Sequence, residues 1–156
     1  VMANTLEAKV TLVEGMHFRA DSGTGFTLPL DAAEESGGQH RGARPLEMLI
    51  MGLGGCTGMD VISILRKMQQ DVTGYEVAVH ADRTDEHPKV YTNVVVEHRV
   101  RGRNVAGDRV RRAVELSATK YCPASAMLSK AVPITHSYVV IDEATGAEVQ
   151  RGSLQE

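Results

Sequence analysis

The sequence predicts an α+β fold, in which sheets are combined with helices that are segregated along the chain rather than alternating with strands. Apolar residues recur at spacings of three and four over residues 45–70, which is typical of a helix. Apolar and polar residues alternate over 6–14, 75–84 and 90–101, which is typical of half-buried strands. At 156 residues with 42% hydrophobic content, the chain is expected to form one domain, 1–156.

The N-terminal third predicts a meander of three antiparallel strands. The alternating segment 6–14 is separated by Gly15 from a short run at 16–20, and turn residues at 21–25 precede a third run at 26–30. The polar, glycine-bearing segment that follows predicts a loop leading to the long helix.

The long helix is predicted to be buried on all sides, in the core or at a subunit interface. Pro45 suits its first position, and the carboxylate of Glu47 suits its first turn. The opposite side also carries apolar residues, so no face is left for solvent. The main face consists of Leu46, Leu49, Ile50, Leu53, Cys56, Asp60, Val61, Ile64, Leu65 and Met68, and the opposite side of Met48, Met51, Met59 and Ile62.

Four glycines interrupt this helix, at positions 52, 54, 55 and 58. Each destabilises a helix by about 0.8–1 kcal/mol relative to alanine, so we expect another part of the structure to pack closely against them. Glu47 and Asp60 lie within the apolar stretch, which disfavours a membrane span.

The C-terminal half predicts a strand pair, two helices and a last strand. Strands 75–84 and 90–101 flank a turn, and Asp108 is a suitable N-cap for a helix over 109–121. A short helix over 123–131 and a strand over 134–142 follow. Residues 143–156 predict a weak strand or a frayed tail.

Composition excludes several function classes. The net charge of −3 without a basic run, together with 4% aromatic residues, disfavours a nucleic-acid partner. The first ten residues lack the pattern of a secretory signal, so we expect a cytoplasmic protein whose two cysteines are reduced at rest. Neither a C-x-x-C motif nor a histidine pair at i, i+4 is present, so we expect no metal and no cofactor.

The two cysteines are the main candidates for chemistry. Cys122 precedes Pro123, a favoured first helical residue, so its thiol is expected at a helix N-terminus, where the dipole favours the thiolate. Burial within a helix raises the pKa of a thiol, so Cys56 is expected to be less reactive. Local physics therefore favours Cys122 as the nucleophile, although either cysteine can also serve simply as a small core residue.

Two other polar residues have both functional and structural interpretations. His136 lies on the strand after the second cysteine and is either an acid/base group or an ordinary sheet histidine. Asp60 follows Cys56 by one helical turn on an apolar face, so its carboxylate needs a partner, either a hydrogen-bond donor nearby or an arginine.

Two segments together resemble the OsmC/Ohr family of osmotically induced and organic hydroperoxide resistance proteins, and within it the YhfA-like branch. They are PLEMLIMGLGGCTGMDVISILRK, which contains Cys56, and KYCPASAMLSKAVPITHSYVV, which contains Cys122. The resemblance implies an OsmC-like fold over nearly the whole chain and an intertwined homodimer with two symmetric sites at the interface. It also implies that the long helices of two subunits pack together at their glycines.

The resemblance further implies a thiol-dependent peroxidase that reduces organic hydroperoxides in oxidative-stress defence. Cys56 would be the peroxidatic cysteine, which becomes a sulfenic acid, and Cys122 the resolving cysteine, which forms a disulfide with it. A dithiol reductant would then reopen that disulfide. This order reverses the ranking from local physics, and we adopt it.

The same family implies an arginine that activates the thiolate and a glutamate that orients the arginine. Arg19 is the most suitable arginine, with Arg44 and Arg41 as alternatives. The family's glutamate follows the helix-opening proline directly, whereas here Leu46 does so and the glutamate is Glu47, about 100° further round the helix.

Our leading hypothesis is therefore a dimeric thiol peroxidase for organic hydroperoxides. A site flanked by Met48, Met51, Met59 and Met127 would suit an alkyl or lipid peroxide. One alternative is a non-catalytic dimer on the same fold that binds a hydrophobic ligand or senses redox state. Another is a cysteine hydrolase or acyl transferase that uses Cys122 with His136.

Overall fold

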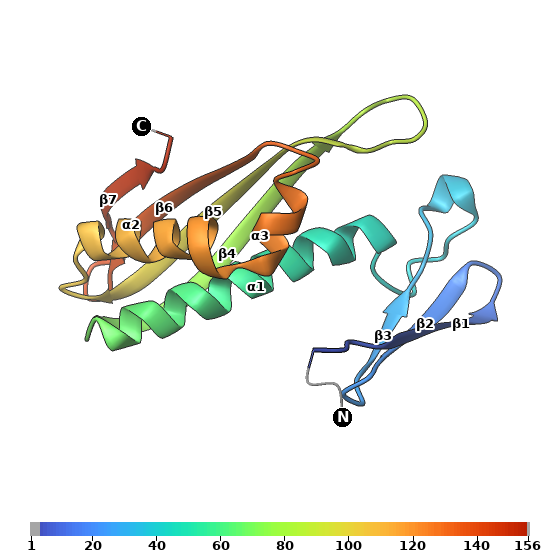
Figure 1. Ribbon diagram of the computed structural model, residues 1–156, viewed down its shortest axis with the longest axis horizontal. Helices are drawn as coiled ribbons and strands as arrows, with labels where there is room; N and C mark the ends of the chain where they lie inside the picture. The colour runs from blue at the N-terminus through green and yellow to red at the C-terminus, as the bar shows by residue number, and fades with distance from the viewer. Residues whose placement is uncertain (1–3, 156) are drawn as a thin grey trace. The chain divides into compact units, whose positions relative to one another are not determined.

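A computed structural model describes residues 4–155 (Figure 1). The chain divides into two compact units, one ending at Leu49 and the other beginning at Ile50. Helix α1, Pro45–Lys67, starts in the first unit and continues in the second. Each unit is described separately below.

The first unit is the predicted three-stranded meander. Strands β1 (Ala8–Glu14), β2 (His17–Ser22) and β3 (Thr27–Leu30) form an antiparallel sheet in that order. The loop that follows contains a 3₁₀ turn, η1 (Glu34–Ser36). The buried carboxylate of Asp31 organises this loop, since it accepts hydrogen bonds from the backbone N–H groups of Ala32, Gln39 and Arg41. These bonds, the one from Gln39 foremost, lower the pKa of Asp31 to about 2.

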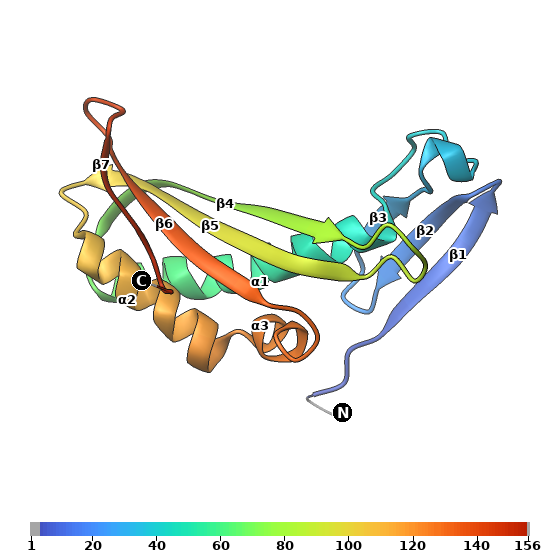
Figure 2. The ribbon, with the colours of Figure 1, turned by 90° about the horizontal axis from the view of Figure 1, so that it is seen from above.

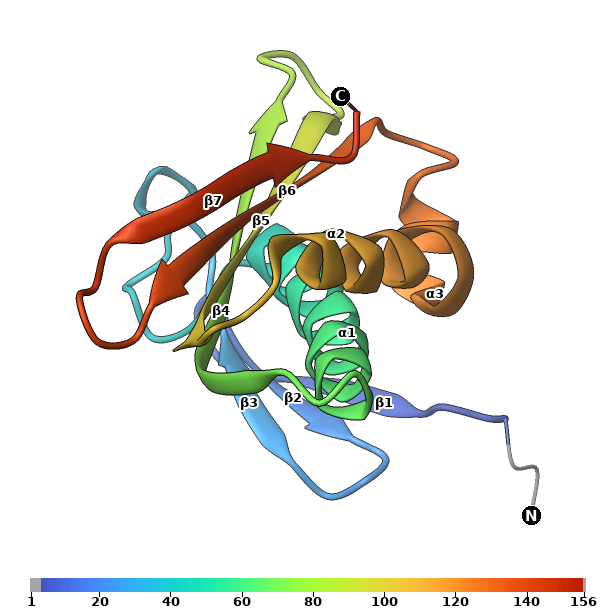
Figure 3. The ribbon, with the colours of Figure 1, turned by 90° about the vertical axis from the view of Figure 1, so that its left-hand side faces the viewer.

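The second unit is a four-stranded sheet with helices on one face (Figures 2 and 3). Its strand order is β4-β5-β6-β7, for Asp71–Arg83, Tyr91–Arg103, Ile134–Asp142 and Glu148–Ser153. Strands β5 and β6 are parallel, and the other neighbours are antiparallel. The connection between β5 and β6 contains α2 (Gly107–Leu116), the π-helical turn η2 (Ser117–Tyr121) and α3 (Pro123–Leu128). The sequence analysis did not predict this parallel pair.

The predicted alternation of the central strands is confirmed. Residues 94, 96, 98 and 100 of β5 are fully buried, and their neighbours of odd number are partly exposed. Those neighbours include Glu97 and Arg99, which form an ion pair at 2.9 Å between Oε1 and Nη1. The helices therefore cover an apolar face of the sheet, whereas the other face is polar.

Helix α1 packs on β4 through two of its four glycines. A Cβ atom on Gly54 would lie 3.1 Å from Val79 Cγ2, and one on Gly58 would lie 3.2 Å from Val77 Cγ2. For these two positions the close neighbour is a strand of the same chain, which corrects the expectation that a second helix explains all four glycines. Within the described residues, Gly52 and Gly55 have no neighbour in the space that a Cβ would occupy.

The expectation that α1 is covered on all sides is wrong for the chain by itself. Leu53, Val61 and Leu65 are fully buried, but Met51 is 57% exposed and Met59 is 74% exposed. By length and hydropathy, α1 is also the one helix of the described residues that could cross a membrane. The core helix of a soluble protein has the same properties, and α1 packs its buried face on the sheet of its own chain.

Several element boundaries differ from the prediction. The N-cap of α2 is Ala106 rather than Asp108, which lies in the first turn instead. The helix predicted over 109–121 changes at Ser117 from α-helical to π-helical, and the helix predicted over 123–131 ends at Leu128. The C-terminal segment, whose structure was left open, forms strand β7.

Candidate active site

Two free cysteines meet on one side of the core of the second unit. Cys56 comes from α1 and is partly buried, and Cys122 comes from the start of α3 and is only 3% exposed. Both contact an apolar cluster that includes Leu53, Val94 and Val96. Long-range packing therefore brings together two thiols that are 66 positions apart in the sequence.

The prediction that Cys122 lies at a helix N-terminus is confirmed. Cys122 is the N-cap of α3, with Pro123 at the first helical position, and its backbone is extended, with φ −78° and ψ 107°. Its Sγ accepts a hydrogen bond from the backbone N–H of Ser125, at 3.3 Å between nitrogen and sulfur. The thiol thus takes the role that a serine or aspartate side chain more often plays.

The first turn of α3 also contacts the other cysteine. The backbone N–H of Ala124 lowers the pKa of the Cys56 thiol, and the neighbouring Cys122 thiol raises it. The first turn of α3 therefore donates a hydrogen bond to the Cys122 sulfur and also affects the Cys56 thiol. This arrangement suits a reaction in which the two sulfurs become bonded to each other.

The Cys56 thiol is not activated by its surroundings in the second unit. Burial raises its pKa above the ordinary value, and the interaction with Cys122 and the charge of Asp60 raise it further. The N–H of Ala124 acts in the opposite direction but does not compensate. A positive group is needed to make this cysteine a fast nucleophile.

Asp60 has a hydroxyl partner rather than an arginine. Ser117 Oγ donates to Asp60 Oδ2 at 3.0 Å, and the hydroxyls of Thr57 and Ser117 hydrogen-bond to each other at 2.8 Å. Thr57 and Ser117 are fully buried. Ser117 opens the π-helical turn η2, so this polar network joins α1 to the segment that leads to Cys122. The sequence analysis singled out neither hydroxyl, because each is a common residue in a helical segment.

The predicted activating groups belong to the first unit. Arg19, on β2, forms an exposed ion pair with Asp21, 3.0 Å between Nε and Oδ2. The carboxylate of Glu47 accepts a hydrogen bond from the backbone N–H of Arg44 at 2.9 Å. This is the reciprocal half of a capping box, in which the third helical residue satisfies the N–H group of the N-cap residue.

The alternative arginines have other surroundings. Arg41 forms an ion pair with Glu14, and its Nε lies 3.6 Å from the Asp31 carboxylate without a hydrogen bond. Arg44 is exposed and immediately precedes α1. Through these contacts, Arg41 helps to stabilise the loop around Asp31.

His136 does not form a pair with Cys122. Its Nδ1 is buried without a hydrogen-bond partner, and its ring stacks on that of His98 at 5.9 Å between centroids. His98 in turn stacks on Tyr75, whose hydroxyl lies 2.5 Å from His98 Nδ1. Burial, with a smaller effect from His136, lowers the pKa of His98 to about 3, so this histidine is neutral at neutral pH.

The family is decided by comparison with known proteins. The model of the OsmC-like protein family matches residues 37–137. Protein YhfA of Escherichia coli K12 is 42% identical over 136 residues, which are 87% of this chain and 98% of the relative. The chain belongs to the OsmC-like family. The predicted resemblance is thereby confirmed.

Solved structures of OsmC-like proteins have the same fold. A hypothetical protein from Aquifex aeolicus VF5 is 26% identical with a TM-score of 0.79, over 90% of this chain and 98% of its own. An organic hydroperoxide resistance protein from Legionella pneumophila is 15% identical with a TM-score of 0.65, over 88% of this chain and 98% of its own. At the lower identity the likeness concerns the fold alone.

The charge of Asp60 gives a first prediction about the thiol. In a Cys122→Ser background, Asp60→Asn should move the midpoint of the pH dependence of Cys56 alkylation to lower pH, because a negative charge near the thiol is removed. An asparagine oxygen can still accept from Ser117. Alkylation by iodoacetamide followed by mass spectrometry measures the rate. Asp108→Asn, in the first turn of α2, is the control, and an unchanged midpoint in Asp60→Asn would contradict the prediction.

The buried His98 gives a second prediction, about stability and pH. Between pH 6.5 and about 3 the unfolded chain binds a proton at this residue and the folded chain does not, so acidification favours unfolding. The loss is at most about 1.4 kcal/mol for each pH unit below 6.5. Urea unfolding should therefore show a smaller difference between pH 7 and pH 5 in His98→Asn than in the unsubstituted chain. His80→Asn, on the exposed side of β4, should retain the full difference.

Proposed function

We propose that this chain is a thiol-dependent peroxidase that reduces organic hydroperoxides. The observation that carries the proposal is that two free cysteines, 66 positions apart in the sequence, pack against the same apolar cluster and affect each other electrostatically. Family membership supports it, and so do the names of solved structures with the same fold, which include organic hydroperoxide resistance proteins from Legionella pneumophila and Elizabethkingia anophelis.

In the first proposed step, the Cys56 thiolate attacks the terminal oxygen of the hydroperoxide. An S–O bond forms, the O–O bond breaks, and the alkoxide leaves and takes up a proton to become an alcohol. Cys56 is then a sulfenic acid, oxidised by two electrons. Its partial exposure allows a peroxide to reach it, whereas Cys122 is only 3% exposed.

In the second step, Cys122 resolves the sulfenic acid. Its sulfur attacks Cys56 Sγ, the S–S bond forms, and the hydroxyl leaves as water after taking the proton of the Cys122 thiol. An external dithiol then reduces the disulfide by thiol–disulfide exchange, becoming a disulfide itself and restoring both cysteines. The two cysteines pack against the same apolar cluster, which supports their pairing in this step.

Activation of Cys56 is assigned to Arg19, with Glu47 orienting it. A guanidinium close to the sulfur would stabilise the thiolate and offset the effects of burial and Asp60. Arg19 is half-exposed and its pairing with Asp21 is at the surface, so it can exchange partners readily. Glu47 would have to combine this role with its bond to the N–H of Arg44.

The functional unit is proposed to be a homodimer. Many large apolar side chains are exposed on each unit. A monomer surface usually exposes such side chains singly, so this number favours an interface. On α1 they lie beside Gly52 and Gly55, which leave room for close approach of a second chain. The exposed set includes Val10, Leu12, Val13, Phe26, Leu28, Leu49, Met51, Met59 and Met127.

A second candidate function is that of a redox sensor without turnover. The observation that favours it is the raised pKa of Cys56, which would make oxidation slow without an activating cation. A sensor would form the Cys56–Cys122 disulfide once and retain it. The two functions differ in whether a dithiol sustains consumption of peroxide.

Stopped-flow kinetics test the thiol chemistry. The reduced chain should consume cumene hydroperoxide faster than a free thiol, of which only about 3% is thiolate at pH 7. Cys56→Ser should abolish the reaction. Without a reductant, Cys122→Ser should consume one equivalent of peroxide, form a sulfenic acid that dimedone traps, and show no intramolecular disulfide. Thr145→Ala, in the turn before β7, is the control.

Two outcomes of this experiment would contradict the peroxidase. Oxidation of the unsubstituted chain no faster than that of a free thiol is one of them. The other is a stoichiometric disulfide that dithiothreitol does not recycle, and this result would identify a sensor.

Sedimentation velocity tests the dimer. The unsubstituted chain should sediment as a dimer, and Met51→Glu with Met59→Glu should give a monomer, because charges would be placed on an apolar interface. Val149→Glu, at an equally exposed apolar position on β7, should remain dimeric. A monomeric unsubstituted chain would contradict the proposal, as would a double variant that still dimerises.

A further inference from the structure

Ser117 joins the parts of the second unit that carry the two cysteines. It is fully buried and opens the π-helical turn η2, which ends one residue before Cys122. Its backbone N–H bonds to the carbonyls of Ala113 and Val114 in α2. Its carbonyl accepts a hydrogen bond from the backbone N–H of Cys122 at 2.9 Å, a bond over five residues that is characteristic of a π turn. The main chain of Ser117 therefore holds the Cys122 backbone directly.

The side chain of Ser117 holds the same turn against α1. Ser117 Oγ donates to the Asp60 carboxylate at 3.0 Å. Because a serine hydroxyl has one hydrogen, the Thr57 hydroxyl is the donor in the 2.8 Å bond between Thr57 and Ser117. Thr57 is fully buried and directly follows Cys56 in the sequence. A path of hydrogen bonds therefore runs from the residue beside Cys56, through Ser117, to the backbone of Cys122.

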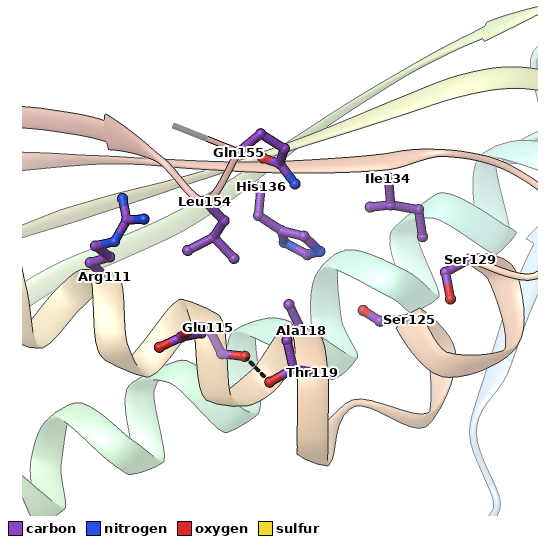
Figure 4. Close-up of a pocket in the computed structure, with 10 residues that line it drawn as sticks. All are labelled: Arg111, Glu115, Ala118, Thr119, Ser125, Ser129, Ile134, His136, Leu154 and Gln155. Atoms are coloured by element: carbon purple, nitrogen blue, oxygen red, sulfur yellow. Dashed lines mark hydrogen bonds between the residues drawn. The ribbon is translucent and has the colours of Figure 1, made fainter.

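The side of η2 that faces β6 is not tightly packed. A pocket of about 280 Å³ lies there, and its lining includes Ala118 and Thr119 of η2 (Figure 4). The Thr119 hydroxyl donates to the Glu115 carbonyl at 2.7 Å, within its own helical segment, so it does not join η2 to the sheet. This side of η2 therefore has room to move, and the buried hydrogen bonds of Ser117 hold the turn against α1.

A disulfide between Cys56 and Cys122 would require an accurate position of η2. The Cα atoms of a disulfide usually lie about 4.4–6.8 Å apart, and the dihedral angle about the S–S bond is restricted. If the turn were mobile, bond formation would have to order it, and the lost conformational entropy would oppose the bond. Ser117 orders the turn while both cysteines are still reduced, so this penalty does not fall on the disulfide.

We propose that Ser117 is a positioning residue for the bond between Cys56 and Cys122. It acts through Thr57 on one side and through the Cys122 backbone on the other. The inference rests on the pairing of the two cysteines in the proposed function. It applies to the peroxidase and to the redox sensor alike, because both form the same disulfide.

A glutathione redox titration of the full chain tests the proposal. Oxidised glutathione takes two electrons and two protons from the cysteine pair, so one disulfide forms in the chain and two molecules of reduced glutathione are released. Half-oxidation of Ser117→Ala should need a ratio of oxidised glutathione to the square of reduced glutathione that is at least about tenfold higher than for the unsubstituted chain. Loss of one or two buried hydrogen bonds usually has an effect of this size. The tenfold change makes the reduction potential of the disulfide about 30 mV less negative. Iodoacetamide trapping followed by mass spectrometry measures the oxidised fraction.

Ser125→Ala is the matched control. Ser125 is also a buried serine near Cys122, but its hydroxyl has no hydrogen-bond partner among residues 4–155. The substitution keeps the backbone N–H that bonds to Cys122 Sγ, so the midpoint should equal that of the unsubstituted chain.

Substitutions of Thr57 give a second comparison that leaves Ser117 in place. Thr57→Val removes the hydroxyl and should shift the midpoint in the same direction as Ser117→Ala. Thr57→Ser keeps the hydroxyl and should not shift it. This pair tests the path of hydrogen bonds even where Ser117→Ala folds poorly.

The outcomes separate the inference from the proposed function. Equal midpoints in Ser117→Ala and the unsubstituted chain would overturn the inference, as would an equal shift in Ser125→Ala. An unsubstituted chain that forms no disulfide at any glutathione ratio would contradict the pairing of the cysteines, and the inference with it. A chain that shows the expected shifts but consumes peroxide no faster than a free thiol would support the inference and contradict only the peroxidase.

Discussion

Close packing of α1 on β4 is the constraint on which the rest of the second unit depends. Because Gly54 and Gly58 carry no side chain, the helix backbone approaches Val79 and Val77 more closely than any larger residue would allow. On the same buried side of α1, Thr57 reaches Ser117 and Cys56 joins the cluster that contains Cys122. The two glycines therefore determine how close to the sheet α1 lies, and with it how deeply the Cys56 thiol is buried. Each glycine destabilises the helix by about 1 kcal/mol relative to alanine.

The electrostatics of the site follow from this depth. Burial, the neighbouring thiol and Asp60 all raise the pKa of Cys56, and the N–H of Ala124 opposes them only in part. Within the part of the chain that the structure describes, no positive group is among the causes of the Cys56 pKa shift, so the proposed function needs a cation near this thiol, the role that we propose for Arg19.

Much of the fold and part of the site could be predicted from the sequence. Alternation predicted which side chains of β4 and β5 point inward, and Pro123 predicted the helix start at Cys122. The parallel pairing of β5 with β6 was missed, because strand neighbours depend on packing across many residues. The inward position of Ser117 and His98 followed from the sequence pattern, but their hydrogen-bond partners did not, because those partners come from distant segments of the chain.

The structure also bears on why the two cysteines should act in the order that the family implies. Local reasoning favoured Cys122 because a helix N-terminus stabilises a thiolate, and the Ser125 N–H does contact that sulfur. A thiol that is 3% exposed is nevertheless poorly placed to meet a peroxide, whereas the partly exposed Cys56 can do so. Resolution of a sulfenic acid needs no access from solvent, because Cys122 attacks from within the same apolar cluster that Cys56 contacts. Access rather than thiolate character therefore favours Cys56 for the first step and Cys122 for the second.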